Sequence, residues 1–177
     1  MTLDVLLNEI EIQQCIHQLV QSIKPMVSGG NVVIIGIDLK GTLIAKRLVN
    51  TLKKELGITC LLGSLDTSLY QEKGTTDYIN VGKTDIPFSL KNKRVLLVTE
   101  SLMTGESINA ALGALSDYDS PDDIKACALI YQNKLRYPIL AEFVGKIVKE
   151  DLKGDIQIHL LEVDGEDKVF KTLKQSV

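Results

Sequence analysis

The residues best suited to chemistry lie within positions 94–115, RVLLVTESLMTGESINAALGAL. The stretch opens with an uninterrupted apolar run, typical of a strand covered on both faces, and ends with apolar residues at helical spacing. Between the two lie Thr104, Gly105 and Ser107. Hydroxyls and backbone N–H groups at the start of a helix bind phosphate well. The pattern therefore predicts a phosphate monoester site, although the same residues could merely cap the helix and ease the turn.

Such a site needs strands that lead into helices, and the sequence alternates in this way. Apolar residues three and four positions apart predict an amphipathic first helix within positions 3–23, and a second helix is expected over 43–56. Strands are expected at 32–37, 58–65, 94–98, 125–131 and 156–161. The alternation predicts an α/β fold with a central, mainly parallel sheet flanked by helices. We expect its ligand crevice at the carboxyl ends of strands, near Ile37 and Val98.

Length and composition fit one core of ordinary size, because the chain has 177 residues, of which 45% are hydrophobic and 24% charged. We therefore expect a single domain over residues 1–177. No apolar run approaches the roughly 18 residues that a membrane span needs, so we expect a cytoplasmic protein. The three cysteines are far apart and the two histidines have no partner at ligand spacing, which argues against a disulfide framework or a metal site built from them.

Taken with its flanks, the 94–115 stretch resembles the ribose-5-phosphate site of type I phosphoribosyltransferases. In that family a strand ends in two acidic residues, and Thr-Gly-x-Thr or Thr-Gly-x-Ser follows. Further stretches resemble the PyrR-type pyrimidine attenuators and uracil phosphoribosyltransferases, in the same order and spacing. They are residues 35–48 (IGIDLKGTLIAKRL), 63–70 (GSLDTSLY), 84–98 (TDIPFSLKNKRVLLV), 141–146 (AEFVGK) and 163–169 (VDGEDKV). The resemblance implies the type I phosphoribosyltransferase fold, in which a small hood covers the crevice.

The resemblance also implies a substrate, 5-phosphoribosyl-1-pyrophosphate (PRPP), which carries Mg²⁺. The two acidic positions that hold its ribose diol correspond to Thr99 and Glu100, the candidate catalytic residues. A threonine hydroxyl is a poor ligand for magnesium, so Glu100 keeps the one carboxylate of the pair that suits the metal. The residues expected to bind the 5′-phosphate are Thr104, Gly105, Glu106 and Ser107.

Two departures from the family pattern affect the phosphate contacts. Glu106 stands where the family usually has a basic residue; a carboxylate in the first helical turn suits the helix dipole, but beside a phosphate it is a like charge. The pyrophosphate loop corresponds to residues 37–41, which include Leu39, Lys40 and Gly41, and the family typically has Thr or Ser followed by Arg where this chain has Leu39 and Lys40. A single ammonium then replaces a bidentate guanidinium. We expect low transferase activity, and weak phosphate binding unless Glu106 points to solvent.

The base is expected to contact Phe143, Val144 and Gly145, which match a run that helps to form the hood in related phosphoribosyltransferases. A buried pair in a short strand would explain the first two residues equally well. The polar residues 71–85 match the flexible loop that closes over the reacting centre, and their alternative interpretation is a simple connector. The arginine that the family carries in this loop is Gln71 here.

Three functions are compatible with these residues. The first is transfer of phosphoribosyl from PRPP to uracil or a related base, at a reduced rate. The second is a catalytically inactive regulatory protein that binds a nucleotide or PRPP. The third is a PyrR-like attenuator that binds RNA, which a net charge of −3 and a pI near 5.4 do little to support. The resemblance also implies a homodimer or a higher homo-oligomer.

Overall fold

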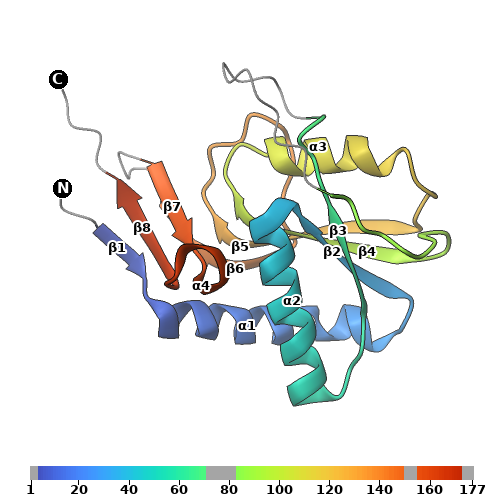
Figure 1. The fold of residues 1–177 in the computed structure, drawn as a ribbon, viewed down its shortest axis with the longest axis horizontal. Helices are drawn as coiled ribbons and strands as arrows, with labels where there is room; N and C mark the ends of the chain where they lie inside the picture. The colour runs from blue at the N-terminus through green and yellow to red at the C-terminus, as the bar shows by residue number, and fades with distance from the viewer. Residues whose placement is uncertain (1–3, 71–82, 150–154, 173–177) are drawn as a thin grey trace.

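The computed structural model describes residues 4–70, 83–149 and 155–172, which form two β-sheets with helices around them (Figure 1). The larger sheet has five parallel strands in the order β3-β2-β4-β5-β6: β2 (Val32–Ile37), β3 (Leu61–Leu65), β4 (Arg94–Leu102), β5 (Asp123–Tyr131) and β6 (Phe143–Ile147). The smaller sheet has three antiparallel strands in the order β1-β8-β7: β1 (Asp4–Leu7), β7 (Asp155–His159) and β8 (Lys168–Thr172). The helices are α1 (Glu9–Ser28), α2 (Asp38–Leu56), α3 (Glu106–Leu115) and α4 (Leu161–Asp164). No helix in these described ranges is long and apolar enough to cross a membrane.

Helices cover both faces of the five-stranded sheet. α1 and α2 pack on one face against residues such as Ile34 and Leu96, whereas α3 packs on the other against Val33 and Val95 (Figure 1). Successive residues of a strand point to opposite faces, so the uninterrupted apolar runs of β2 and β4 belong to strands buried on both sides. The predicted α/β fold with a central parallel sheet is confirmed.

The first helix begins later than its apolar spacing suggested. Asp4–Leu7, expected to be helical, form β1 and pair with β8. The Asn8 side chain accepts a hydrogen bond from the Glu11 backbone N–H (3.0 Å), and the Asn8 backbone N–H donates to the Glu11 carboxylate (2.8 Å). This reciprocal cap satisfies backbone N–H groups that the first turn leaves unpaired, and it sets the helix start at Glu9.

Two segments lie in a different sheet from the one expected. β7, predicted as a strand of the parallel sheet, pairs antiparallel with β8 in the smaller sheet. Residues 143–145, predicted to help form the hood, lie in β6 at the edge of the larger sheet. We therefore call the smaller sheet together with α4 the hood. It lies to one side of the larger sheet in Figure 1.

Close packing between α2 and the sheet explains why α2 starts directly after β2, earlier than predicted. A Cβ on Gly36 would lie 2.2 Å from Thr42 Cα, and a Cβ on Gly41 would lie 2.5 Å from the Val98 carbonyl oxygen. Neither position has room for a side chain, because both neighbours are backbone atoms. The glycines thus let the first turn of α2 rest against β4.

Candidate functional site

The carboxyl ends of β2 and β4 lie next to each other, because the two strands are parallel neighbours with Gly36 opposite Val98. β4 runs on to Leu102, so Thr99 and Glu100 belong to the strand itself and not to the residues beyond it. The predicted diol-binding pair therefore lies beside the first turn of α2, at the edge of the sheet where ligands bind in open α/β folds.

Thr99 and Glu100 have different surroundings. Thr99 is 1% exposed, and its hydroxyl lies 3.2 Å from the Ser101 carbonyl oxygen and 3.3 Å from a Glu100 carboxylate oxygen. Burial raises the pKa of Glu100 above its ordinary value. Hydrogen bonds from the backbone and from Thr99 oppose this rise, and the charges of Asp38 and Lys40 act in opposite directions. A carboxyl group with a raised pKa at such an edge is a candidate for functional chemistry.

Asp38 belongs to the segment that the sequence matched to the pyrophosphate loop, but no local pattern indicated its own contacts. Its φ of 53° lies in the left-handed region, which is uncommon for residues other than glycine. Its carboxylate accepts hydrogen bonds from the backbone N–H (2.9 Å) and the hydroxyl (3.0 Å) of Thr67, a fully buried residue just after β3. These contacts tie the end of β2 to the end of β3.

The predicted pyrophosphate loop is the first turn of α2 rather than a loop, because Leu39, Lys40 and Gly41 are helical. The Lys40 ammonium donates to the Ile158 carbonyl oxygen (2.5 Å) and lies 2.9 Å from the Asp164 carboxylate. The Leu160 backbone N–H lowers the pKa of Asp164, and Lys40 lowers it further. Lys40 is thus bonded to the hood. Leu39 is exposed and Gly41 is buried.

The predicted phosphate residues 104–107, called the phosphate turn below, comprise the last two residues before α3 and the first two residues of α3. Gly105 is the N-cap of α3, and its φ of 87° suits glycine. The Thr104 carbonyl accepts hydrogen bonds from the backbone N–H groups of Arg136 (2.9 Å) and Tyr137 (3.0 Å). The Thr104 hydroxyl accepts a long bond from the Glu106 N–H (3.3 Å). The turn is therefore held by the segment that follows β5.

Glu106 forms an ion pair that the sequence did not predict. One of its carboxylate oxygens lies 2.9 Å from Nη1 of Arg136, and both side chains are about half exposed, at 45% and 56%. The like charge expected beside a phosphate is therefore matched by a cation from a segment 30 residues away. No local spacing signals this pairing, because the two residues lie in different elements.

The predicted base-contacting residues do not lie in the hood. Phe143 and Val144 pair with Cys127 and Ala128 of β5, in register with a parallel neighbour. A Cβ on Gly145 would lie 2.7 Å from a carbonyl oxygen of β5, so this edge strand is fitted closely to the sheet. Phe143 and Val144 thus lie in a short strand, where both are partly buried, and their contact with the base stays a prediction. The predicted closing loop falls largely on residues 71–82, which lie outside the described residues.

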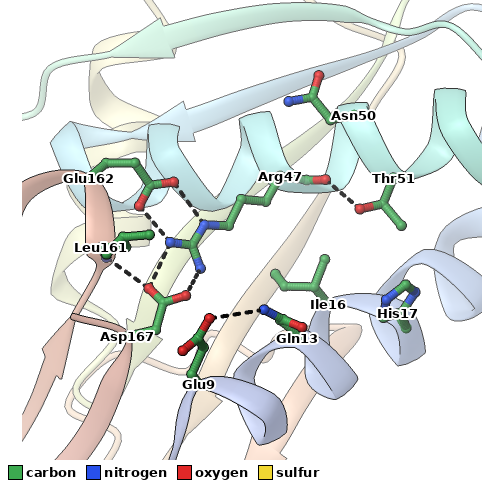
Figure 2. Close-up of a pocket in the computed structure, with 10 residues that line it drawn as sticks. All are labelled: Glu9, Gln13, Ile16, His17, Arg47, Asn50, Thr51, Leu161, Glu162 and Asp167. Carbon is green, nitrogen blue, oxygen red and sulfur yellow. Dashed lines mark hydrogen bonds and ion pairs between the residues drawn. The ribbon is translucent and has the colours of Figure 1, made fainter. Parts of the chain in front are cut away.

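A separate polar cluster ties α2 to the hood (Figure 2). The Arg47 guanidinium makes paired hydrogen bonds with Glu162 (2.9 and 2.5 Å) and with Asp167 (2.8 and 2.7 Å). Burial lowers the pKa of Arg47, but the two carboxylates outweigh burial and raise it overall. These residues line one side of a pocket of about 380 Å³, whose other side is formed by α1. We call this cluster the Arg47 clamp.

Comparisons with known proteins agree with this arrangement. Residues 3–158 match the phosphoribosyl transferase domain. The chain is 40% identical to the bifunctional protein PyrR of Geobacter sulfurreducens over 128 residues, covering 71% of this chain and 72% of that protein. It is 33% identical to PyrR of Chloroflexus aurantiacus over 167 residues, covering 93% and 92%.

Solved structures of hypoxanthine phosphoribosyltransferases share the fold. Those from Staphylococcus aureus and Trypanosoma cruzi superpose with TM-scores of 0.72 and 0.73, at 21% and 17% identity. Each comparison covers 97% of this chain and 91% of the other. Because the matched domain and the PyrR relatives span most of the sequence, this chain belongs to the phosphoribosyltransferase family, has the type I fold of that family and is related to the bifunctional PyrR proteins.

Proposed function

We propose that this protein transfers the phosphoribosyl group of PRPP to uracil or a related base. The observation that carries the proposal is the placement of Glu100 and the phosphate turn on consecutive parts of one strand-turn-helix unit, β4 to α3. In the reaction, the bond from the anomeric carbon to pyrophosphate breaks, a bond to a base nitrogen forms, and that nitrogen loses its proton.

Different parts of PRPP would meet different groups of the chain. The 5′-phosphate would accept hydrogen bonds from the backbone N–H groups and hydroxyls of the phosphate turn, at the positive end of the α3 dipole. The diol would donate to the Glu100 carboxylate, whose position is fixed within β4. Thr99 is buried beside it and would contribute at most one weak contact.

Mg²⁺ would enter with PRPP. Magnesium is usually bound through one or two carboxylates together with substrate phosphates. Glu100 supplies a carboxylate of this kind and is the protein ligand that we assign. Within the described part of the chain, no three His, Cys, Asp or Glu side chains are grouped so that they could hold a metal ion. When bound, the cation would neutralise charge on the departing pyrophosphate.

Lys40, the residue expected to bind the pyrophosphate, already has partners in the hood. Its ammonium already donates to the Ile158 carbonyl and lies beside the Asp164 carboxylate. A lysine has three donors, so pyrophosphate would have to share the ammonium with the hood or displace it. This competition adds to the two substitutions, at Thr99 and Lys40, from which we expect a reduced rate.

Lys40 and Thr99 also favour a second candidate function, which is binding of a nucleotide without turnover. A nucleoside monophosphate needs the phosphate turn but not a pyrophosphate contact. A protein that kept the turn and lost the diol and pyrophosphate contacts would act as a nucleotide sensor.

One experiment separates the two candidates. One sample of the purified protein is incubated with uracil, labelled PRPP and Mg²⁺ to measure turnover. UMP is titrated into a second sample by calorimetry to measure binding. Turnover supports the transferase, and binding of UMP without turnover supports the sensor. If the protein shows no turnover and no UMP binding, both candidates are contradicted. Glu100→Gln should lower any turnover about 100-fold or more, since a charged partner is lost in the site. The control is Glu142→Gln, which alters an exposed carboxylate paired with Lys125 on the sheet edge.

A further inference from the structure

A carboxylate at the phosphate turn needs a compensating cation if the turn is to hold a phosphate. Glu106 lies in the first turn of α3, where a phosphate dianion would meet its like charge. Arg136 Nη1 lies 2.9 Å from a Glu106 carboxylate oxygen. As a pair, the two side chains carry no net charge.

We propose that Arg136 supplies the cationic side chain of the 5′-phosphate site, and that Glu106 positions it. The inference rests on the proposed function, because it concerns the same site. It adds a residue from the segment after β5 to a site that otherwise belongs to β4 and α3. The ligand group that it would recognise is a phosphate monoester.

The backbone holds Arg136 at the turn independently of its exposed side chain. The backbone N–H groups of Arg136 and Tyr137 both donate to the Thr104 carbonyl, at 2.9 and 3.0 Å. A Cβ placed on Gly105 would lie 3.2 Å from Tyr137 Cβ, so the two segments are in close contact. The Arg136 guanidinium carbon also lies 5.8 Å from the centre of the Tyr137 ring, within cation–π range.

The chemistry of the guanidinium allows both contacts at once. Its five N–H donors can meet a carboxylate on one edge and two phosphate oxygens on another. The contact with Glu106 is made by Nη1. Because both side chains are about half exposed, Arg136 can adjust toward a ligand without disturbing the core.

The test compares binding of UMP and uridine by calorimetry, since uridine lacks the phosphate. Arg136→Gln should weaken UMP binding about tenfold or more, as expected when a charge-assisted hydrogen bond is lost, and leave uridine binding unchanged. Lys134→Gln, an exposed cation of the same segment, is the matched control and should leave UMP binding within about twofold. Urea unfolding checks that each variant is folded.

A charge swap gives a second, independent test. Arg136→Glu alone places two carboxylates together and should weaken UMP binding more than Arg136→Gln does. Adding Glu106→Arg restores one cation and one anion, and should recover most of the lost affinity. If the wild type binds UMP and Arg136→Gln binds it equally well, the role of Arg136 is refuted while the proposed function stands. If the wild type binds neither UMP nor PRPP, the proposed function fails and this inference fails with it.

Discussion

The Arg47 clamp offers a sharp test of how the hood is attached to α2. The change is Arg47→Met, which keeps an apolar stem of similar length and removes the guanidinium. Arg47 is 19% exposed, and its partners Asp167 and Glu162 are 6% and 40% exposed. The variant therefore leaves one nearly buried carboxylate and one partly hydrated carboxylate without the cation that pairs them.

The expected loss lies between two limits. Exposed ion pairs contribute about 0.2–1 kcal/mol, whereas removing one partner of a buried pair costs about 3–5 kcal/mol. Asp167 is near the buried limit, although the Leu161 backbone N–H also donates to it (2.8 Å), and Glu162 is nearer the exposed limit. We expect the free energy of unfolding to fall by about 2–3 kcal/mol. For a chain of this size the midpoint of thermal unfolding should fall by roughly 5–10 °C.

The pH dependence follows from the carboxylates. Burial raises the pKa of Asp167, but Arg47 and the Leu161 N–H outweigh it and leave the pKa lowered; the pKa of Glu162 is lowered by Arg47. Groups whose pKa is lower in the folded state stabilise it at pH values above the unfolded pKa, about 3.9 for Asp and 4.3 for Glu. That contribution is lost as the pH falls through the folded values. The difference between wild type and variant should be full at pH 7 and shrink below about pH 4.

Urea unfolding followed by circular dichroism, at pH 7 and at pH 3, measures both effects. Lys46→Met is the matched control, because it removes an exposed cation from the neighbouring position of the same helix. It should change the free energy of unfolding by less than about 0.5 kcal/mol. A loss that small for Arg47→Met at pH 7, or an equal loss at both pH values, would refute the reasoning.

Three further predictions concern packing, catalysis and thiol chemistry. Gly41→Ala should destabilise the protein by about 1–3 kcal/mol in urea unfolding, because its Cβ would lie 2.5 Å from a backbone oxygen of β4. Gly113→Ala should be neutral or stabilising, because its Cβ would lie 3.4 Å from the Tyr70 ring, at ordinary contact distance. Equal effects would contradict the packing argument. Thr99→Asp combined with Lys40→Arg should raise the rate of UMP formation, because it restores a carboxylate and a bidentate cation; a rate no higher than that of the wild type would show that these substitutions are not the damaging ones. Complete burial raises the pKa of the Cys127 thiol to about 12, so Cys127 should resist thiol reagents at pH 8 until urea unfolds the protein. Mass spectrometry of the labelled chain measures this, and labelling of Cys127 in the folded protein would contradict the burial.

Much of the fold could be predicted because its signals are local. The apolar run of β2, the helical spacing after Gly105 and the glycine that ends α2 each reflect backbone preferences within a few residues. That Glu100 lies close to the phosphate turn could be predicted for the same reason, because both belong to one strand-turn-helix unit. The start of α1 was missed because a polar cap at Asn8 outweighed the apolar spacing before it.

The remaining features depend on contacts between distant parts of the chain. An edge strand such as β6 and a strand of another sheet such as β7 have similar local patterns, and only their hydrogen-bonding partners distinguish them. Likewise, the partners of Glu106 and Lys40 are 30 and 118 residues away, at Arg136 and the Ile158 carbonyl. Sequence alone determined which residues carry charge and where strands and helices can form. The tertiary structure decided which charges meet, because the energy of an ion pair depends on distance and burial in space and not on separation along the chain.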